Sequence, residues 1–533
     1  MLSPCPILDT AKYGMIKDLP AHRLPPGAWT DVNNVRFLDG YMTQAMPFSF
    51  YAMRGLSTKA PCLLMPAFGP GQGWIYVDDL YLMYMTRTGA ANGTLGGHAY
   101  APNVNWQGSM FNGFAILNNE VDAPRYAYFD GTYAVFGNVP AWPADLRVKV
   151  LRPYKNFLVG LDVTVGGARD KRRVRWSASA DPATLPTSWD ITDATKDAGD
   201  VSLAEGTDGL LDCLPLGNGN IVYGETQTWV MRYVGGQFIF AFDRLFPITG
   251  ILATDTLTAI PQGHFVITQD DLIIHAGDSP KSVGDMAMRR WFFKNLSPEH
   301  YRHTQVFSFK AEREVWICYP SIHTVVNAEG FPRVDSALIW NWQTNVFTYR
   351  DLSLAGSVDT HRLAVGYSPK VSGSPFTTWD SDTYSWDSDT ESWDTLSPSD
   401  RSGEGIILDQ GTNWVYIDGT AEGVLSSSFE RLGIGINANN ELEHYNYKEL
   451  VAIRPDFEAP EGSTILIQAG HQNLKNDPVT WDDSQIFTVG VDTEVQIHTT
   501  GRYICLRFFI QPTGKDWKFY GYYLDQAQLK EGL

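Results

Sequence analysis

Residues 211–234 read LDCLPLGNGNIVYGETQTWVMRYV, a succession of short β-rich runs separated by polar turns. The first turn is the Gly-Asn-Gly-Asn of residues 217–220, and the second contains Glu225, Thr226 and Gln227. Runs of branched and aromatic residues around such turns are typical of antiparallel hairpins. The stretch therefore predicts a small antiparallel sheet.

Hairpins of this kind recur every few tens of residues between Trp74 and Gly419. We expect them at residues 74–84, 109–117, 126–135, 148–160, 265–275, 337–349 and 405–419. A regular series of small sheets predicts an all-β chain with a β-propeller. An array of β-sandwiches is the competing architecture, because no strict propeller repeat motif is present. Helix is expected to be scarce, with one short segment within residues 286–296 and a candidate second helix beginning at residues 297–299.

The character of the chain changes near residue 420. Strand-like runs follow at residues 449–455, 463–469, 485–489 and 502–510. Their total length suits one β-sandwich. We therefore predict a propeller domain over residues 1–420 and an appended β-sandwich domain over residues 421–533. Residues 1–40 could belong to either domain.

The charge balance restricts the possible partners. Of 533 residues, 41 are basic and 60 acidic, which gives a formal net charge of -19. This argues against general attraction to nucleic acid or to an anionic membrane. The five cysteines form no Cys-x-x-Cys pair and are expected to be reduced, mostly buried thiols. We expect no secretion signal and no membrane segment.

No sequence motif indicates catalysis. There is no phosphate-binding loop, no nucleophile elbow and no zinc-protease motif. His300 and His303 are spaced to share a metal, but no suitably spaced carboxylate completes a site. The sequence therefore predicts a protein that is not an enzyme and uses no metal or other cofactor.

An acidic repeat occupies residues 376–400, where Trp379, Trp386 and Trp393 recur at a spacing of seven. Its candidate functional residues are Asp380, Asp382, Asp387, Asp389 and Asp394. Three interpretations remain open. The repeat is a solvated loop with its tryptophans against a sheet, a negatively charged loop facing a lumen or a partner, or a cation-binding loop.

A basic cluster stands out against the acidic background. Strand alternation places Lys171, Arg173 and Arg175 on one face, where they could contact nucleic acid or an acidic neighbouring subunit. The alternative is a charged edge strand that resists aggregation.

Several phrases resemble the tail nozzle, or packaged-DNA stabilisation, proteins of short-tailed (podovirus-type) bacteriophages. They include DLPAH at residues 18–22, PPGAWTDVNNVRF at 25–37, VRWS at 174–177 and RYICLRF at 502–508. The resemblance extends from about residue 18 to residue 524 and lies in the order of phrases rather than in one diagnostic motif.

The resemblance implies a β-propeller joined to a platform-like sandwich, in a structural virion protein of the viral tail that is assembled in the bacterial cytoplasm. Six copies would form a ring at the portal vertex, bound to portal and adaptor proteins and to tail fibre or needle proteins. The ring would retain packaged DNA and form the conduit for DNA ejection, without sequence-specific binding. A receptor- or glycan-binding tail protein is the alternative, and a polysaccharide-degrading propeller enzyme is a third hypothesis.

Overall fold

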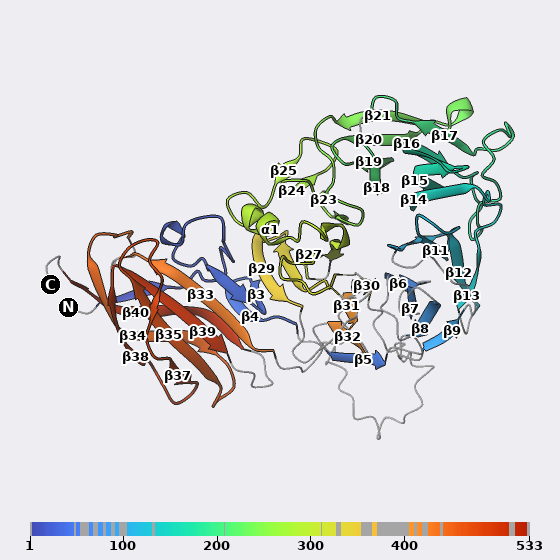
Figure 1. The fold of residues 1–533 in the computed structure, drawn as a ribbon. Helices are drawn as coiled ribbons and strands as arrows, with labels where there is room; N and C mark the ends of the chain where they lie inside the picture. Colours follow the sequence, from blue (N-terminus) through green and yellow to red (C-terminus); the bar gives the residue numbers. More distant parts are fainter. Residues whose placement is uncertain are drawn as a thin grey trace, which may run out of the picture.

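The computed structural model places the chain in two joined lobes, a β-propeller and a β-sandwich (Figure 1). The structure describes residues 3–46, 49–53, 63–67, 73–77, 81–86, 91–94, 104–130, 134–206, 208–310, 312–326, 332–352, 365–369, 404–409, 413–417, 425–436, 441–510 and 517–529. The expected all-β class is confirmed, and the propeller rather than an array of sandwiches is observed.

Within these residues the propeller contains seven four-stranded antiparallel sheets, or blades. The first two are β6 (Leu63–Ala67), β7 (Gly73–Val77), β8 (Leu82–Thr86) and β9 (Ala91–Thr94), then β10 (Gln107–Phe111), β11 (Phe114–Asn118), β12 (Arg125–Phe129) and β13 (Ala134–Asn138). The third and fourth are β14 (Leu146–Tyr154), β15 (Phe157–Val165), β16 (Ala168–Trp176) and β17 (Gly199–Ser202), then β18 (Leu210–Leu216), β19 (Gly219–Gly224), β20 (Thr228–Tyr233) and β21 (Phe240–Phe246).

The fifth blade comprises β22 (Leu257–Ile260), β23 (Gly263–Ile267), β24 (Leu272–His275) and β25 (Lys281–Ser282). The sixth comprises β26 (Gln305–Phe309), β27 (Glu314–Tyr319), β28 (Ser336–Asn341) and β29 (Val346–Asp351). The seventh comprises β30 (Val365–Pro369), β31 (Glu404–Asp409), β32 (Asn413–Ile417) and β5 (Ser49–Met53). First strands of neighbouring blades contact each other, as β10 does with β6 and β14, so they line the central axis.

The ring is closed by a strand from the N-terminal part of the chain. Strand β5 pairs with β32 and forms the outer strand of the last blade. Strand β30 of that blade contacts β6 of the first. Because the last sheet combines segments more than 300 residues apart in sequence, closure couples both ends of the propeller segment.

The hairpins expected from sequence are observed. For example, Tyr154 pairs with Phe157 around the turn at Lys155 and Asn156. Lys155 has a φ of 51°, the left-handed conformation that such a tight turn requires. The expected short helix is also present, as α1 (Arg289–Asn295). Three 3-10 turns accompany it among the described residues: η1 (Ala21–Arg23), η2 (Gly236–Phe238) and η3 (Tyr301–His303).

The second lobe is a sandwich of two six-stranded sheets. One sheet contains β1 (Ser3–Ile7), β3 (Val35–Leu38), β4 (Tyr41–Gln44), β34 (Tyr447–Glu458), β38 (Val495–Gly501) and β40 (Lys518–Leu529). The other contains β2 (Asp31–Asn33), β33 (Ser427–Ile434), β35 (Thr464–Gln472), β36 (Thr480–Trp481), β37 (Gln485–Thr488) and β39 (Tyr503–Ile510). Strand β38 alternates buried and exposed residues, as a strand with one face on a core requires.

The N-terminal boundary expected for the propeller is wrong. Strands β1–β4, within residues 3–44, pair with strands of the C-terminal sandwich instead of a blade. Val32, Val35 and Phe37 are buried in the core that the sandwich strands share. The Trp29 ring lies 4.7 Å from that of Phe429, edge to face. Residues 3–44 are therefore an integral part of the sandwich, because their backbone and their apolar side chains both complete it.

The two lobes share one continuous hydrophobic core. Val35 and Phe37 of the sandwich belong to the same buried cluster as Phe265, Trp340 and Phe347 of blades five and six. Strand β29, the outer strand of blade six, contacts β2 and β3. The Thr348 hydroxyl donates a hydrogen bond to the carbonyl of Val35 at 2.6 Å. Such a joint is apolar and hydrogen-bonded, unlike the smaller polar contacts of domains that move freely.

Helix α1 strengthens this joint. Its N-terminal backbone NH groups, those of Arg290 and Trp291, donate to the two carboxylate oxygens of Asp18 at 2.8 and 2.9 Å. An aspartate at this position satisfies NH groups that have no partner within the helix. Asp18 lies in the segment that leads into the sandwich, so this cap ties the two lobes together.

Candidate functional site at the mouth of the propeller channel

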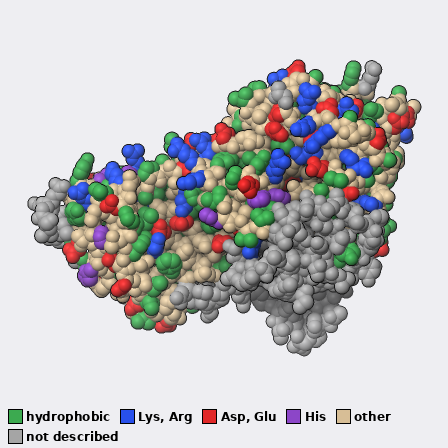
Figure 2. All heavy atoms as spheres, viewed as in Figure 1, with side chains coloured by type: hydrophobic (Ala, Val, Ile, Leu, Met, Phe, Trp, Pro, Cys, Tyr) green, Lys and Arg blue, Asp and Glu red, His purple; other side chains and the backbone are tan. Residues whose placement is uncertain are grey.

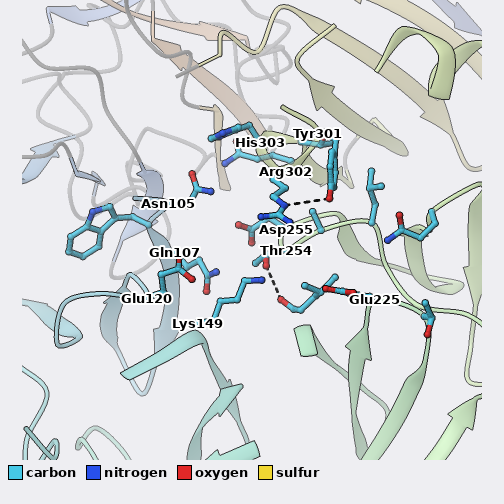
Figure 3. Close-up of a pocket in the computed structure, with 18 of the residues that line it drawn as sticks. Asn105, Gln107, Glu120, Lys149, Glu225, Thr254, Asp255, Tyr301, Arg302 and His303 are labelled. Atoms are coloured by element: carbon cyan, nitrogen blue, oxygen red, sulfur yellow. Dashed lines mark hydrogen bonds between the residues drawn. The ribbon is translucent and has the colours of Figure 1, made fainter. Parts of the chain in front are cut away.

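A cavity of about 490 Å³ opens at one end of the central axis of the propeller. Its wall is formed by the starts of the first strands of several blades and by the loops that connect the second strand of a blade to the third. Gln107 begins β10, Glu225 follows β19, and Asp255 and Gln305 precede or begin the first strands of blades five and six. Side chains from distant parts of the chain therefore face one space (Figure 3).

Positive charges converge on this cavity from three elements. Lys149 comes from β14, Arg169 from β16 and Arg302 from η3. In Figure 3, Lys149 and Arg302 extend from opposite sides toward the part of the cavity beside Thr254. Burial lowers the pKa of Lys149, and the positive charges of Arg169 and Arg302 lower it further, while Asp162 and Glu120 oppose this shift.

The three cations differ in how they are compensated. Arg169 forms a two-pronged ion pair with Asp162, at 2.7 and 2.6 Å. Arg302 makes a 3.4 Å hydrogen bond to the hydroxyl of Tyr301, and no described carboxylate lies within ion-pair distance of it. The Lys149 ammonium also has no carboxylate within ion-pair distance among the described residues. The Tyr301 hydroxyl is the main cause of a raised pKa of Arg302, and the negative charges of Glu225 and Glu120 raise it further at longer range.

A second ion network braces the wall. Arg152 of β14 donates to both oxygens of Asp212 at 2.8 and 2.9 Å and to Asp255 at 2.5 Å. The backbone NH of Asp255 donates to Asp212 at 3.0 Å. Since these residues belong to blades three and four and to the segment entering blade five, the network holds the neighbouring blades in register.

Several buried polar atoms of the cavity wall have no hydrogen-bond partner among the residues that the structure describes. They are the side-chain oxygens of Gln107, Thr304 and Gln305. Gln107 is 7% exposed and Thr304 1% exposed. Buried polar atoms in proteins are normally satisfied by protein, water or ligand. These three oxygens therefore lack an assigned partner in residues that line the cavity.

The predicted basic patch is only partly a surface patch. Lys171 is exposed, but Arg173 lies 3.5 Å from both Asp170 and Asp200. The proposed contact role of Arg175 is wrong, because its side chain is buried and donates to the carbonyl of Trp189 at 2.6 Å. Residues 173–176 pair with β17 in regular register, so Arg173 and Arg175 lie on the same side of the strand but differ in burial.

The interpretation of this cluster as an edge strand is wrong for residues 173–176 of β16. Strand β16 lies between β15 and β17, and β17 pairs with residues 173–176. On the propeller face seen in Figure 2, basic and acidic side chains intermingle rather than forming a single-sign surface. The acidic residues Asp380, Asp382, Asp387, Asp389 and Asp394 lie outside the described residues.

The histidine pair considered as a metal site lies partly at the channel. His303 lines the cavity, and its ring centre is 6.5 Å from that of His300. The part of the chain that the structure describes contains no group of three or more His, Cys, Asp or Glu residues placed to hold a metal ion. Cys5, Cys213, Cys318 and Cys505 are buried and not in disulfides, as expected.

Lys149, Arg302 and Glu120 were not singled out from sequence. Lys149 stands in a regular alternating strand and Arg302 in a three-residue turn, so neither has a local signal. The unpaired buried oxygens of Gln107 and Gln305 are also visible only in three dimensions.

Comparisons with known proteins give only weak similarities. No protein family and no curated protein sequence matches the chain. Among solved structures, virginiamycin B lyase from Staphylococcus aureus is similar at 7% identity and a TM-score of 0.39, covering 69% of this chain and 97% of that one. The β-propeller domain of Cps50 (Swd1) from Myceliophteria thermophila is similar at 9% identity and a TM-score of 0.38, covering 70% and 99%. YCF48 bound to D1 peptide is similar at 8% identity and a TM-score of 0.35, covering 70% and 96%.

These weak similarities carry no conclusion about the activity of this chain. Among the described residues, no helix has the length and hydrophobicity needed to cross a membrane.

Proposed function

We propose that this protein is a structural subunit of the tail nozzle of a short-tailed bacteriophage. Copies of the chain would form a closed, hexameric ring at the portal vertex, contacting adaptor and portal proteins on one side and fibre or needle proteins on the other. In this proposal the protein acts in the virion tail after assembly in the host cytoplasm, has no catalytic role and requires no cofactor.

The observation that carries the proposal is the rigid joint between the lobes. The shared hydrophobic core, the Asp18 cap on α1 and the contacts of β29 with β2 and β3 make the propeller and sandwich one body. A subunit that withstands the pressure of packaged DNA needs this property, whereas loosely joined domains would bend at the linker. The net charge of -19 adds support, because an acidic lumen of the proposed ring would repel phosphates and would not hinder the passage of DNA.

Two of the sequence segments that resemble the nozzle family lie in the sandwich core and at its contact with blade six. Residues 25–37 contain Trp29 of the sandwich core and the strands β2 and β3 that contact blade six. Residues 502–508 contain most of β39, which pairs with β33 and β35. These positions support a common architecture with that family, and the ring and its partners follow from the proposal.

Quantitative mass spectrometry of purified phage particles tests the proposal, with the major capsid protein as the internal reference. We expect about six copies per particle, as a closed ring of the proposed symmetry requires. Native mass spectrometry of the recombinant chain should show monomers or the same ring and no other closed assembly. Absence from particles overturns the proposal, and a higher copy number that is a multiple of three would favour a receptor-binding fibre or spike.

A further inference from the structure

We propose that the mouth of the propeller channel binds a small polyhydroxylated carboxylate, of the hexuronic acid class. This site is separate from the proposed ring-forming role and does not depend on it. The proposal rests on the cavity, on two cations without a described ion-pair partner, and on three buried oxygens without a hydrogen-bond partner in residues that line the same space.

The size and position of the cavity suit a small ligand. Its volume of about 490 Å³ lies in the range typical of small-molecule sites, and it is lined by described residues of blades two to six. The Arg152–Asp212–Asp255 network holds part of the wall in a defined geometry. A ligand in this space would therefore meet preorganised groups.

The charges call for an anion. Lys149 and Arg302 face the cavity without a described carboxylate in ion-pair distance, although each lies close enough to the other for their charges to interact. The charges of the half-buried Lys149 ammonium and the exposed Arg302 repel each other, and an anion between them would offset this repulsion. A carboxylate accepts hydrogen bonds from both a guanidinium and an ammonium, which makes it a suitable counter-ion.

The unsatisfied oxygens call for donors on the same molecule. Gln107 and Gln305 present amide oxygens that only accept hydrogen bonds, and Thr304 presents a hydroxyl. A bare anion offers no donor to the amide oxygens, and a neutral sugar leaves the cations uncompensated. A sugar acid supplies both a carboxylate and several hydroxyl groups.

The neighbouring acids favour a single negative charge over two. Glu120 and Glu225 line the same cavity and interact electrostatically with Arg302. They would oppose a phosphate dianion more strongly than a carboxylate monoanion. We therefore assign the site to a hexuronate rather than to a hexose phosphate, which shares the same arrangement of anion and hydroxyls.

Ligand-observed NMR and isothermal titration calorimetry on the full chain test this assignment. The probes are D-glucuronate, D-galacturonate, D-glucose and D-glucose 6-phosphate at equal ionic strength. We expect a uronate to bind with a Kd of about 1 mM, as suits a small solvent-accessible site, and glucose to bind at least about tenfold more weakly.

Two matched pairs of variants locate the binding. K149Q and R302Q should each weaken uronate binding by about tenfold, equivalent to one lost charge-assisted hydrogen bond. K171Q and R232Q carry the same chemical changes at positions outside the cavity and should leave binding unchanged. Circular dichroism and thermal unfolding establish that each variant is folded, and Arg302 is exposed enough that its replacement does not disturb a core.

The proposal is overturned if neither uronate binds at about 20 mM, or if K149Q and R302Q bind it as tightly as the unchanged chain. Equal or tighter binding of glucose 6-phosphate overturns the assignment to a carboxylate. Binding of glucose as tight as that of the uronates would show that Lys149 and Arg302 do not contribute to affinity, which also contradicts the proposal.

Discussion

Arg36 of the sandwich and Glu314 of propeller blade six form an ion pair across the joint between the lobes, with the Arg36 Nε 2.9 Å from Oε1. The pair joins positions 278 residues apart in sequence. Arg36 also donates to Glu312 at 2.6 Å, and Glu314 accepts a hydrogen bond from the indole of Trp316 at 2.9 Å. The carboxylates raise the pKa of Arg36 despite its burial, so it remains charged.

Loss of Arg36 should therefore destabilise the protein strongly. R36L leaves Glu314 buried without its cation, and we expect the free energy of unfolding to fall by about 3 kcal/mol. Urea denaturation followed by tryptophan fluorescence measures this change. R232Q, which removes an exposed ion pair with Asp243, is the control and should change stability by less than about 1 kcal/mol. Equal effects of the two variants would contradict a special role for the joint.

Gly14 lies at a close approach between the N-terminal segment and blade six. Its φ is +62°, and a Cβ there would lie 2.8 Å from the Cβ of Val346 and 2.9 Å from the carbonyl oxygen of Phe347. G14A should destabilise the chain by about 2 kcal/mol more than backbone strain alone, because the added methyl group overpacks the joint.

G40A provides the matched control. Gly40 also has a positive φ, +90°, but no atom lies within 4 Å of the added Cβ position. G40A should therefore cost only about 1 kcal/mol, the cost of the left-handed conformation. Thermal unfolding of both variants separates crowding from strain, and equal losses would show that the close approach does not matter.

A buried hydrogen-bond chain joins blades four and five. The backbone NH of Gly277 donates to Nδ1 of His275, so Nε2 of that ring carries the proton and donates to the Tyr223 hydroxyl at 2.8 Å. Tyr223 then donates to Nδ1 of His264 at 2.7 Å, whose Nε2 donates to the carbonyl of Pro215 at 3.0 Å. Both histidines are neutral in this arrangement.

These buried hydrogen bonds between Tyr223 and the two histidines predict that the protein is less stable in acid. Burial lowers the pKa of His275 to about 4 and also lowers that of His264. The unfolded chain takes up protons below about pH 6.5, whereas the folded state does not until lower pH. The free energy of unfolding should therefore fall as the pH decreases from about 6.5 to about 4. Urea denaturation across this range should show a shallower fall in H275L than in the unchanged chain. H498Q, at an exposed position, should retain the original pH dependence, and an unchanged slope in H275L would contradict the prediction.

The basic cluster on β16 divides into one structural and one surface position. R175M removes the only described donor to the carbonyl of Trp189 and should lower stability by about 1–2 kcal/mol, because that buried acceptor loses its partner. K171Q, on the exposed part of the same strand, should stay within about 0.5 kcal/mol. Differential scanning calorimetry measures both, and a destabilising K171Q with a neutral R175M would reverse this assignment.

Local features of the fold could be predicted from sequence because they depend on short-range chemistry. Hairpins such as 148–160 and the helix within 286–296 have their turn residues and apolar patterns in one segment. The affiliation of residues 3–44 could not be predicted in this way. Their strands are short and polar enough to suit either lobe, and their partners, β33 and β40, lie about 400 residues or more away.

The sequence by itself determined that the chain is all-β, built mostly of small sheets, acidic overall and supplied with thiols suited to burial. The tertiary structure decided how the ring closes through β5, how the lobes join through Arg36 and Asp18, and where Lys149 and Arg302 meet. The physical reason is that turns and alternation are set by neighbours in the chain. Ring closure, the shared core and the channel lining instead depend on the packing of sheets that are far apart in sequence. Two arginines show this: Arg175 is buried and donates to a backbone carbonyl, whereas Arg302 faces an open cavity.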